Sequence, residues 1–378
     1  MATPEIDKIS KQGFDALSKG DYELACSCWS KVIQADSINA DAYISRGIAR
    51  IGMNDLEGAI NDWNEAIRLK PDGAEAYANR GNILQRKGEL DQAMIDWSKA
   101  IDLDPRNAEI YYNRGRGFQE KQNWDKAISD YSAAIQLNPD YFQAYTNRGR
   151  IYGRLAEWSR AFADFDEAIR IKPTNFNAYA SRGEAHQFRG ELDKAISDFD
   201  EALLLDPEAG KIYYRRGNCY FKKGDLDVAM RDYSRAVAND PCLAEAYYER
   251  GNVHRQKRNW IESINDYQEA MNLNPKVPQP LNNLAWILAT CPESSSRNGK
   301  RAVEAATKAC ELTAWKKWNC VGTLAAAFAE LGAFNQDIKF QKQAMNMEKI
   351  PDKARNEAQQ RLNLYCQHKP FRMPDDNS

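Results

Sequence analysis

The chain has few of the residues and segments that mark several classes of protein. It contains 3 histidines among 378 residues, which argues against a histidine-rich metal site. No stretch approaches the roughly 20 apolar residues of a membrane-spanning helix, and the opening MATPEIDKISKQGF has no apolar core of a signal peptide. Neither sign of charge is in excess, with 52 Lys and Arg against 54 Asp and Glu, so the basic footprint of a nucleic-acid binder is missing. We therefore expect a cytoplasmic protein with no membrane insertion and no nucleic-acid partner.

Motifs for redox, metal or catalytic chemistry are missing as well. The 8 cysteines are dispersed and none forms a CxxC pair. The sequence has no GxxxxGK[ST] or GxGxxG loop, no HExxH and no GxSxG. We expect no cofactor, no metal and no catalytic residue, and therefore a protein that is not an enzyme.

What the sequence does contain is one motif, repeated. The dipeptide Arg-Gly recurs every 34 residues from Arg46-Gly47 to Arg250-Gly251, without insertion or deletion, and Gln12-Gly13 stands in register before it. Other positions recur at the same period. The unit that spans residues 74–107 carries, in order, Tyr77, Gly81, Ala93, Trp97, Ala100 and Pro105.

This pattern of aromatic, glycine, alanine, aromatic, alanine and proline resembles the tetratricopeptide repeat (TPR) family. One departure is systematic, because Arg stands before the glycine where the family usually has Leu. The resemblance implies an all-α fold, a right-handed superhelical solenoid of helix-turn-helix repeats. Gly and Ala would let paired helices approach closely, and the aromatics would fill the space beside that contact.

The strict repeat ends at Pro275, and the predicted organisation has four parts. Residues 1–275 form eight regular units, and residues 276–350 form two divergent hairpins. The string LAWILATCP in the second part resembles a C-terminal module attached to many bacterial TPR proteins. Residues 351–367 form the helix that caps the last apolar face, and residues 368–378 form a flexible tail.

Arg at the seventh position of the unit and Asp at the twenty-third recur together. Exposed catalytic carboxylates would not repeat along a solenoid, so we interpret the two residues as a bidentate ion pair that joins helices or neighbouring units. Three of these pairs are Arg80 with Asp96, Arg114 with Asp130, and Arg148 with Asp164.

In TPR proteins the first helix of each unit lines a concave groove, and the resemblance implies that a partner protein binds there. Asn79, Asn113 and Asn147 share the sixth position, like the asparagine ladder of the O-linked N-acetylglucosamine transferase superhelix, whose amides bind the backbone of an extended peptide. A plainer interpretation is that Asn tolerates a half-exposed helix position. The other groove candidates, of types enriched at binding hot spots, are Asn82, Tyr112, Arg116, Arg150, Tyr214, Asn218, Tyr248 and Asn252.

These observations predict a non-enzymatic protein–protein interaction scaffold that binds an extended peptide segment or a partner helix in its groove. Two alternatives stay open. The chain could be an accessory subunit that presents a substrate to an enzyme, or it could self-associate through its ends, with Trp286, Trp315 and Trp318 providing an apolar surface. The sequence does not specify the partner, the pathway or the oligomeric state.

Overall fold

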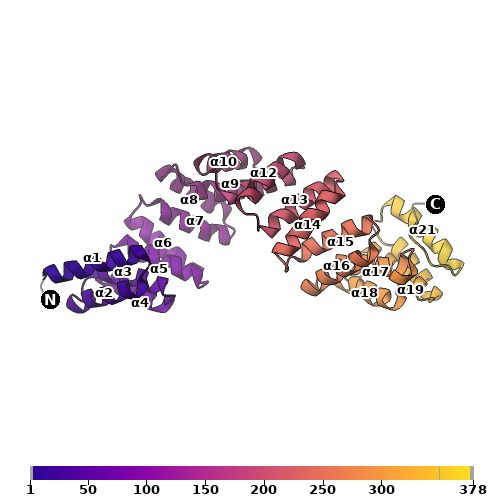
Figure 1. Cartoon of the computed structure of the whole chain (residues 1–378), viewed down its shortest axis with the longest axis horizontal. Helices are drawn as coiled ribbons and strands as arrows, with labels where there is room; N and C mark the ends of the chain where they lie inside the picture. Colours follow the sequence, from indigo (N-terminus) through magenta and orange to yellow (C-terminus); the bar gives the residue numbers. More distant parts are fainter. Residues whose placement is uncertain (1–2, 349, 375–378) are drawn as a thin grey trace. The chain divides into compact units, whose positions relative to one another are not determined.

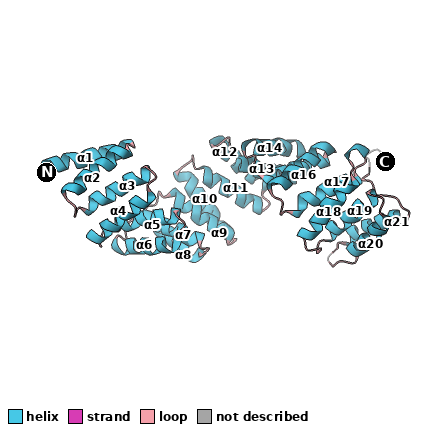
Figure 2. Cartoon of the chain, turned by 90° about the horizontal axis from the view of Figure 1, so that it is seen from below, coloured by secondary structure: helices cyan, strands magenta, loops and turns pink. Residues whose placement is uncertain are grey.

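The structure is a computed structural model that describes residues 3–348 and 350–374. Within these ranges every long element is an α-helix, one short 3₁₀ turn interrupts them, and no strand is present (Figure 1, Figure 2). The all-α fold of paired helices is therefore confirmed. The chain divides into two compact units, residues 1–181 and 182–378, which are described in turn.

In the first unit each odd-numbered helix packs with the helix that follows it as a hairpin, from α1 with α2 to α9 with α10. Each hairpin then packs on the next one. The helices of this unit are α1 (Thr3–Lys19), α2 (Tyr22–Ala35), α3 (Ala40–Gly52), α4 (Leu56–Leu69), α5 (Ala74–Arg86), α6 (Leu90–Leu103), α7 (Ala108–Glu120), α8 (Trp124–Leu137), α9 (Phe142–Arg154) and α10 (Trp158–Ile171).

The boundary between the units falls inside α11 (Phe176–Phe188). In the second unit α13 to α20 again pack in pairs, and α21 packs on α20. The remaining helices are α12 (Leu192–Leu205), α13 (Gly210–Lys223), α14 (Leu226–Asn239), α15 (Ala244–Gln256), α16 (Trp260–Leu273), α17 (Pro278–Thr290), α18 (Gly299–Leu312), α19 (Trp318–Glu330), α20 (Phe334–Met345) and α21 (Asp352–Cys366).

Each hairpin closes on a contact between a glycine and an aromatic ring. A Cβ added to Gly81 of α5 would lie 2.8 Å from Trp97 of α6, and Trp97 is fully buried. The equivalent distance from Gly115 to Tyr131 is 2.9 Å. Only glycine leaves room for the ring, which is why the two residues recur together in the sequence.

Local sequence signals begin and end the helices. Asp55 and Asn123 precede α4 and α8, and their side chains accept hydrogen bonds from the backbone N–H groups of Gly58 and Lys126 in the first turns. Gly224 ends α13 in the left-handed conformation, with φ of 85°, which glycine adopts without steric cost.

The turn between α17 and α18 is longer than its counterparts and contains the 3₁₀ turn Ser294–Ser296. Arg297 holds it by donating to the carbonyl oxygens of Cys291 and Pro292 at 2.9 and 2.8 Å. Asn298 then caps α18 by accepting from the backbone N–H of Arg301.

Candidate functional site

The repeated arginine joins three helices. Arg80 of α5 donates from Nε and Nη2 to the two carboxylate oxygens of Asp96 on α6, at 2.7 Å each. Its Nη1 donates to Oδ1 of Asn64 on α4, in the preceding hairpin, at 2.6 Å. Asp96 is only 1% exposed, and the bidentate charge-assisted bonds offset the cost of burying its carboxylate.

The next two units repeat this arrangement. Arg114 and Arg148 bind Asp130 and Asp164 in the same bidentate way. Their Nη1 atoms reach Oγ of Ser98 and of Ser132 in the preceding hairpins, at 3.2 and 2.8 Å. The structure thus places all three predicted pairs as cross-links inside the hairpin stack.

The asparagines of the first helices also join neighbouring repeats. Oδ1 of Asn82 on α5 accepts from Nε1 of Trp97 at 2.9 Å and from Nδ2 of Asn113 on α7 at 3.1 Å. Nδ2 of Asn147 on α9 donates to the hydroxyl of Tyr112 on α7 at 3.1 Å. One bond links α5 to α7 and another links α7 to α9, so these side chains form a row of polar contacts across the three helices.

The other predicted residues of the first unit border this row. Asn79 lies half-buried on α5, and Arg116 and Arg150 are exposed on α7 and α9. Nε of Arg150 donates to Oγ of Ser181 at 2.8 Å. Burial raises the pKa of Tyr112 above its ordinary value, although Arg116 and Arg150 oppose this shift. Its hydroxyl therefore keeps its proton at neutral pH and can donate as well as accept.

The predicted residues of the second unit contact core aromatics in the same manner as Asn82. Oδ1 of Asn218 on α13 accepts from the hydroxyl of Tyr233 at 2.8 Å. Burial raises the pKa of Tyr214, and its ring lies 6.2 Å from that of Tyr233. The asparagine at the ninth position of the unit therefore satisfies a buried aromatic donor, a role that its position in the sequence did not indicate.

Asn252 and Tyr248 on α15 are joined through the next helix. Oδ1 of Asn252 accepts from the hydroxyl of Tyr267 at 2.7 Å and from Nδ2 of Asn283 on α17 at 3.1 Å. The same Nδ2 lies 3.3 Å from the hydroxyl of Tyr248. Asn283 therefore joins α15 and α17 within the second unit.

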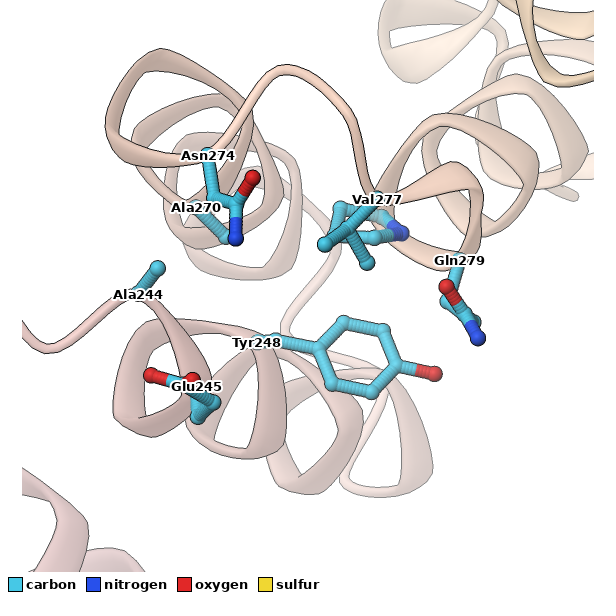
Figure 3. Close-up of a pocket in the computed structure, with 8 residues that line it drawn as sticks. Ala244, Glu245, Tyr248, Ala270, Asn274, Val277 and Gln279 are labelled. Atoms are coloured by element: carbon cyan, nitrogen blue, oxygen red, sulfur yellow. The ribbon is translucent and has the colours of Figure 1, made fainter. Parts of the chain in front are cut away.

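Two hollows flank the ring of Tyr248. One, of about 210 Å³, lies between α15, α16 and α17, where Tyr248 faces Val277 and Gln279 (Figure 3). The other, of about 390 Å³, is bordered by Tyr248, Gln279, Asn282, Asn283, Lys317 and Trp318. Sequence reasoning missed Gln279 and Asn282, although they occupy the second and fifth positions of the ninth unit and could have been found by extending the register past Pro275.

A third hollow, of about 650 Å³, is formed by α11, α13 and α15 within the second unit. Its walls include Asn218, Arg215 and Phe221. Nε of Arg215 lies 2.9 Å from a carboxylate oxygen of Glu184. This surface is polar and charged, with an aromatic ring at its side.

The flexible tail predicted for residues 368–378 includes residues that contact the second unit, and residues 375–378 lie outside the described part of the chain. Met373 donates its backbone N–H to the carbonyl oxygen of Thr290 at 2.9 Å. Arg372 lies 2.5 Å from Glu330. The last carbonyls of a helix have no partner within the helix, and the segment after α21 supplies donors to those of α17.

The three tryptophans proposed as an end surface lie in different surroundings. Trp286 of α17 packs against Phe371, with 5.9 Å between ring centroids. Trp315 stacks on Phe340 at 6.0 Å and is 37% exposed. Trp318 borders the 390 Å³ hollow. Each of the three thus contacts different neighbours in the described structure.

Residues 3–348 and 350–374 include no helix whose length and apolarity would let it cross a lipid bilayer. In the same ranges, no three histidine, cysteine, aspartate or glutamate side chains gather where they could hold a metal ion.

Comparison with known families identifies the class of protein. Family profiles described as TPR repeat or tetratricopeptide repeat match residues 50–88, 81–119, 115–155, 142–175, 181–244 and 244–277. The chain belongs to the tetratricopeptide repeat family, whose members are typically non-enzymatic protein-interaction scaffolds. No curated protein matches the chain.

One solved structure shares the fold, and two others are similar to parts or all of the chain at lower TM-scores. A tetratricopeptide repeat protein from Parabacteroides merdae is 24% identical to this chain. The match covers 62% of this chain and 93% of the other protein's chain, with a TM-score of 0.51. MamA is 28% identical over 44% of this chain and 96% of its own, with a TM-score of 0.41. Yeast Tom70 is 15% identical over 97% and 96%, with a TM-score of 0.42.

Proposed function

We propose that the chain is a non-catalytic scaffold that binds an extended segment of a partner protein along the first helices α5, α7 and α9. The observation that carries the proposal is the row of polar contacts on these helices, in which Asn113 and Asn147 each donate an amide N–H to a neighbouring repeat. The row supports the proposal because it orders polar side chains on successive repeats before a ligand arrives.

The amides retain hydrogen-bonding capacity for a ligand. An asparagine side chain has two N–H donors and an oxygen that accepts two bonds. Asn113 donates one N–H to Asn82, which leaves its second N–H and its oxygen for a ligand. Asn147 donates to Tyr112 and also hydrogen-bonds the hydroxyl of Tyr131, so its oxygen is the group that can serve a ligand. A donor and an acceptor on one side chain match the C=O and N–H groups of an extended backbone.

The residues around the row fit a protein partner. Exposed Arg116 and Arg150 stand beside it, and Tyr112 adds an aromatic ring with a hydroxyl. Arginine and tyrosine are enriched at binding hot spots. Because 52 basic residues are balanced by 54 acidic ones, the chain as a whole does not favour a nucleic acid.

The test begins with the intact chain as bait for a library of random linear peptides. The affinity of the selected peptide is then measured by fluorescence anisotropy for the wild type and for a variant that carries Asn113→Ala and Asn147→Ala. Each lost amide removes bonds worth about 1 kcal/mol, so we expect the peptide to bind at least about tenfold more weakly to the variant.

A matched control variant carries Ser98→Ala and Ser132→Ala. It also loses two hydrogen bonds between repeats, but these lie on the second helices and involve Arg114 and Arg148. Its affinity for the peptide should stay within about twofold of the wild type. Equal affinities for wild type, the asparagine variant and the control would place the binding site elsewhere.

A further inference from the structure

The segment 371–374 contacts the second unit as a bound peptide would. The ring of Phe371 packs against that of Trp286 on α17, with the planes inclined by 37°. The guanidinium of Arg361 on α21 lies over both rings, 5.6 Å from the centroid of Trp286 and 5.9 Å from that of Phe371. An aromatic side chain is thus held between a tryptophan and a cation.

The next residue in the segment makes a charged contact. Nη2 of Arg372 lies 2.5 Å from Oε2 of Glu330 at the end of α19. Nη1 of Arg372 donates to the carbonyl oxygen of Ala289 in the last turn of α17, at 3.2 Å. A helix C-terminus carries partial negative charge, so both contacts select a cationic side chain.

Backbone hydrogen bonds complete the contact. The N–H of Met373 donates to the carbonyl oxygen of Thr290, and Nη2 of Arg258 donates to the carbonyl oxygen of Pro374 at 2.8 Å. Such bonds are independent of side-chain identity and are the usual means of holding an extended peptide. Phe371 and Arg372 therefore provide the specificity, and the backbone provides the register.

The segment lies on the continuation of the predicted groove. Trp286 follows Asn283 by three residues and Asn282 by four. Both asparagines border the 390 Å³ hollow. Residues at these spacings share one face of a helix. The hollow and the segment therefore occupy successive turns of the same face of α17.

Part of the site has partners outside the segment, although Phe371 and Met373 also pack against core clusters of the second unit. Glu330 is also bound by Nε of Arg297 at 3.0 Å, and Arg361 projects from α21. Phe371, Arg372 and Met373 are only half-buried, and residues 366–369 before them are exposed. Nε of Arg361 is buried and has no hydrogen-bond partner in the described structure, so a ligand that brings an acceptor to this atom would bind better than the segment does.

We infer that residues 371–374 are an intramolecular ligand, and that the site on α17, α19 and α21 takes from a partner protein an extended segment in which an aromatic residue is followed by arginine. In the unliganded chain the segment occupies this site and competes with the partner. The inference extends the proposed function by naming a second binding position and the chemistry of its ligand, and it rests on the same use of the first helices.

The test uses the full chain and a labelled peptide, HKPFRMPDDNS, which has the sequence of residues 368–378. Fluorescence anisotropy measures the binding of this peptide to the wild type and to a variant carrying Phe371→Ala and Arg372→Ala. A tethered segment competes at an effective concentration on the order of millimolar, so the variant should bind the peptide at least about tenfold more tightly than the wild type.

Two controls define specificity. A chain carrying Lys369→Ala, which changes an exposed residue outside the contact, should bind the peptide as weakly as the wild type. A peptide with alanine in place of its phenylalanine, or glutamate in place of its arginine, should not bind the chain that carries Phe371→Ala and Arg372→Ala.

The inference is wrong if the variant with Phe371→Ala and Arg372→Ala melts like the wild type and does not bind the peptide. It is equally wrong if this variant and the wild type bind the peptide with the same affinity. It is also wrong if the substitutions lower the melting temperature and excess peptide does not restore it, because the segment would then be a structural cap. A chain that ends at Lys369 repeats the measurement without substituted side chains. This test involves only the second unit. Its failure would therefore not bear on the test of Asn113 and Asn147, and failure of that test would not bear on this one.

Discussion

Two glycines one turn apart in α9 should respond in opposite directions to the same substitution. A Cβ added to Gly149 would lie 2.8 Å from Cε1 of Phe165 and 3.2 Å from the carbonyl oxygen of Ala161. A Cβ added to Gly153 would meet only Cζ3 of Trp158, at 3.8 Å, which is an ordinary van der Waals contact. The pair therefore separates helix propensity from packing within one helix.

The magnitudes follow from two opposing effects. Replacing a helical glycine by alanine gains roughly 0.5–1 kcal/mol because the unfolded chain loses freedom. Overpacking a close contact costs about 1–3 kcal/mol, and Phe165 is 1% exposed, so its ring has no solvent-facing space to move into. Gly149→Ala should destabilise by about 0.5–2 kcal/mol, whereas Gly153→Ala, near the end of α9, should be neutral or stabilise by up to about 1 kcal/mol.

Urea denaturation of the full chain, followed by circular dichroism at the helical band, measures both variants against the wild type. Because repeat arrays do not always unfold in one step, the comparison between the two variants is more informative than either absolute value. A Gly149→Ala midpoint at or above that of the wild type would refute the packing argument, as would an equal loss in Gly153→Ala.

Two further predictions concern buried charge. Reversal of either Arg114 or Asp130 should cost about 3–5 kcal/mol, because a buried charge loses its partner, and the double reversal should recover part of that loss; additive losses in the double-mutant cycle would contradict the pairing. Burial raises the pKa of the Asp337 carboxyl to about 6, so the native state binds this proton more tightly than the unfolded chain, and stability should fall as the pH rises from about 4 to about 6. Asp337→Asn should flatten this dependence and raise the melting temperature at pH 7.5, and an unchanged pH profile in Asp337→Asn would contradict the assignment.

The helices and their pairing could be predicted because they depend on local signals. Gly81 and Trp97 recur with a constant separation, and the contact between them follows from that separation alone. The Arg80–Asp96 pair was predictable for the same reason. Its third partner, Asn64 in the preceding hairpin, was not, because it depends on the stacking of one hairpin on another.

The candidate groove was predictable only in part. The sequence places the candidate residues on the first helices, but the bonds from Asn113 to Asn82 and from Asn147 to Tyr112 depend on the distance between successive first helices. The segment after α21 was the least predictable part. A short stretch with two prolines and no helical period is usually free, and no local pattern indicates the contacts of Phe371 with Trp286 and Arg361, which are distant in the sequence or on other helices.

The arginine that reaches back to the preceding hairpin also constrains how this chain can change length. Ser98 and Ser132 occupy equivalent positions, 34 residues apart, so the loss of residues 108–141 as a block would present Ser98 to Arg148 in the place of Ser132. A deletion or duplication of another size that ends inside a helix would shift the register of that helix and leave a guanidinium facing an unrelated side chain. The loss or gain of whole units keeps these cross-links, and the unbroken spacing of the Arg-Gly dipeptides is the pattern that such a history of copying would leave.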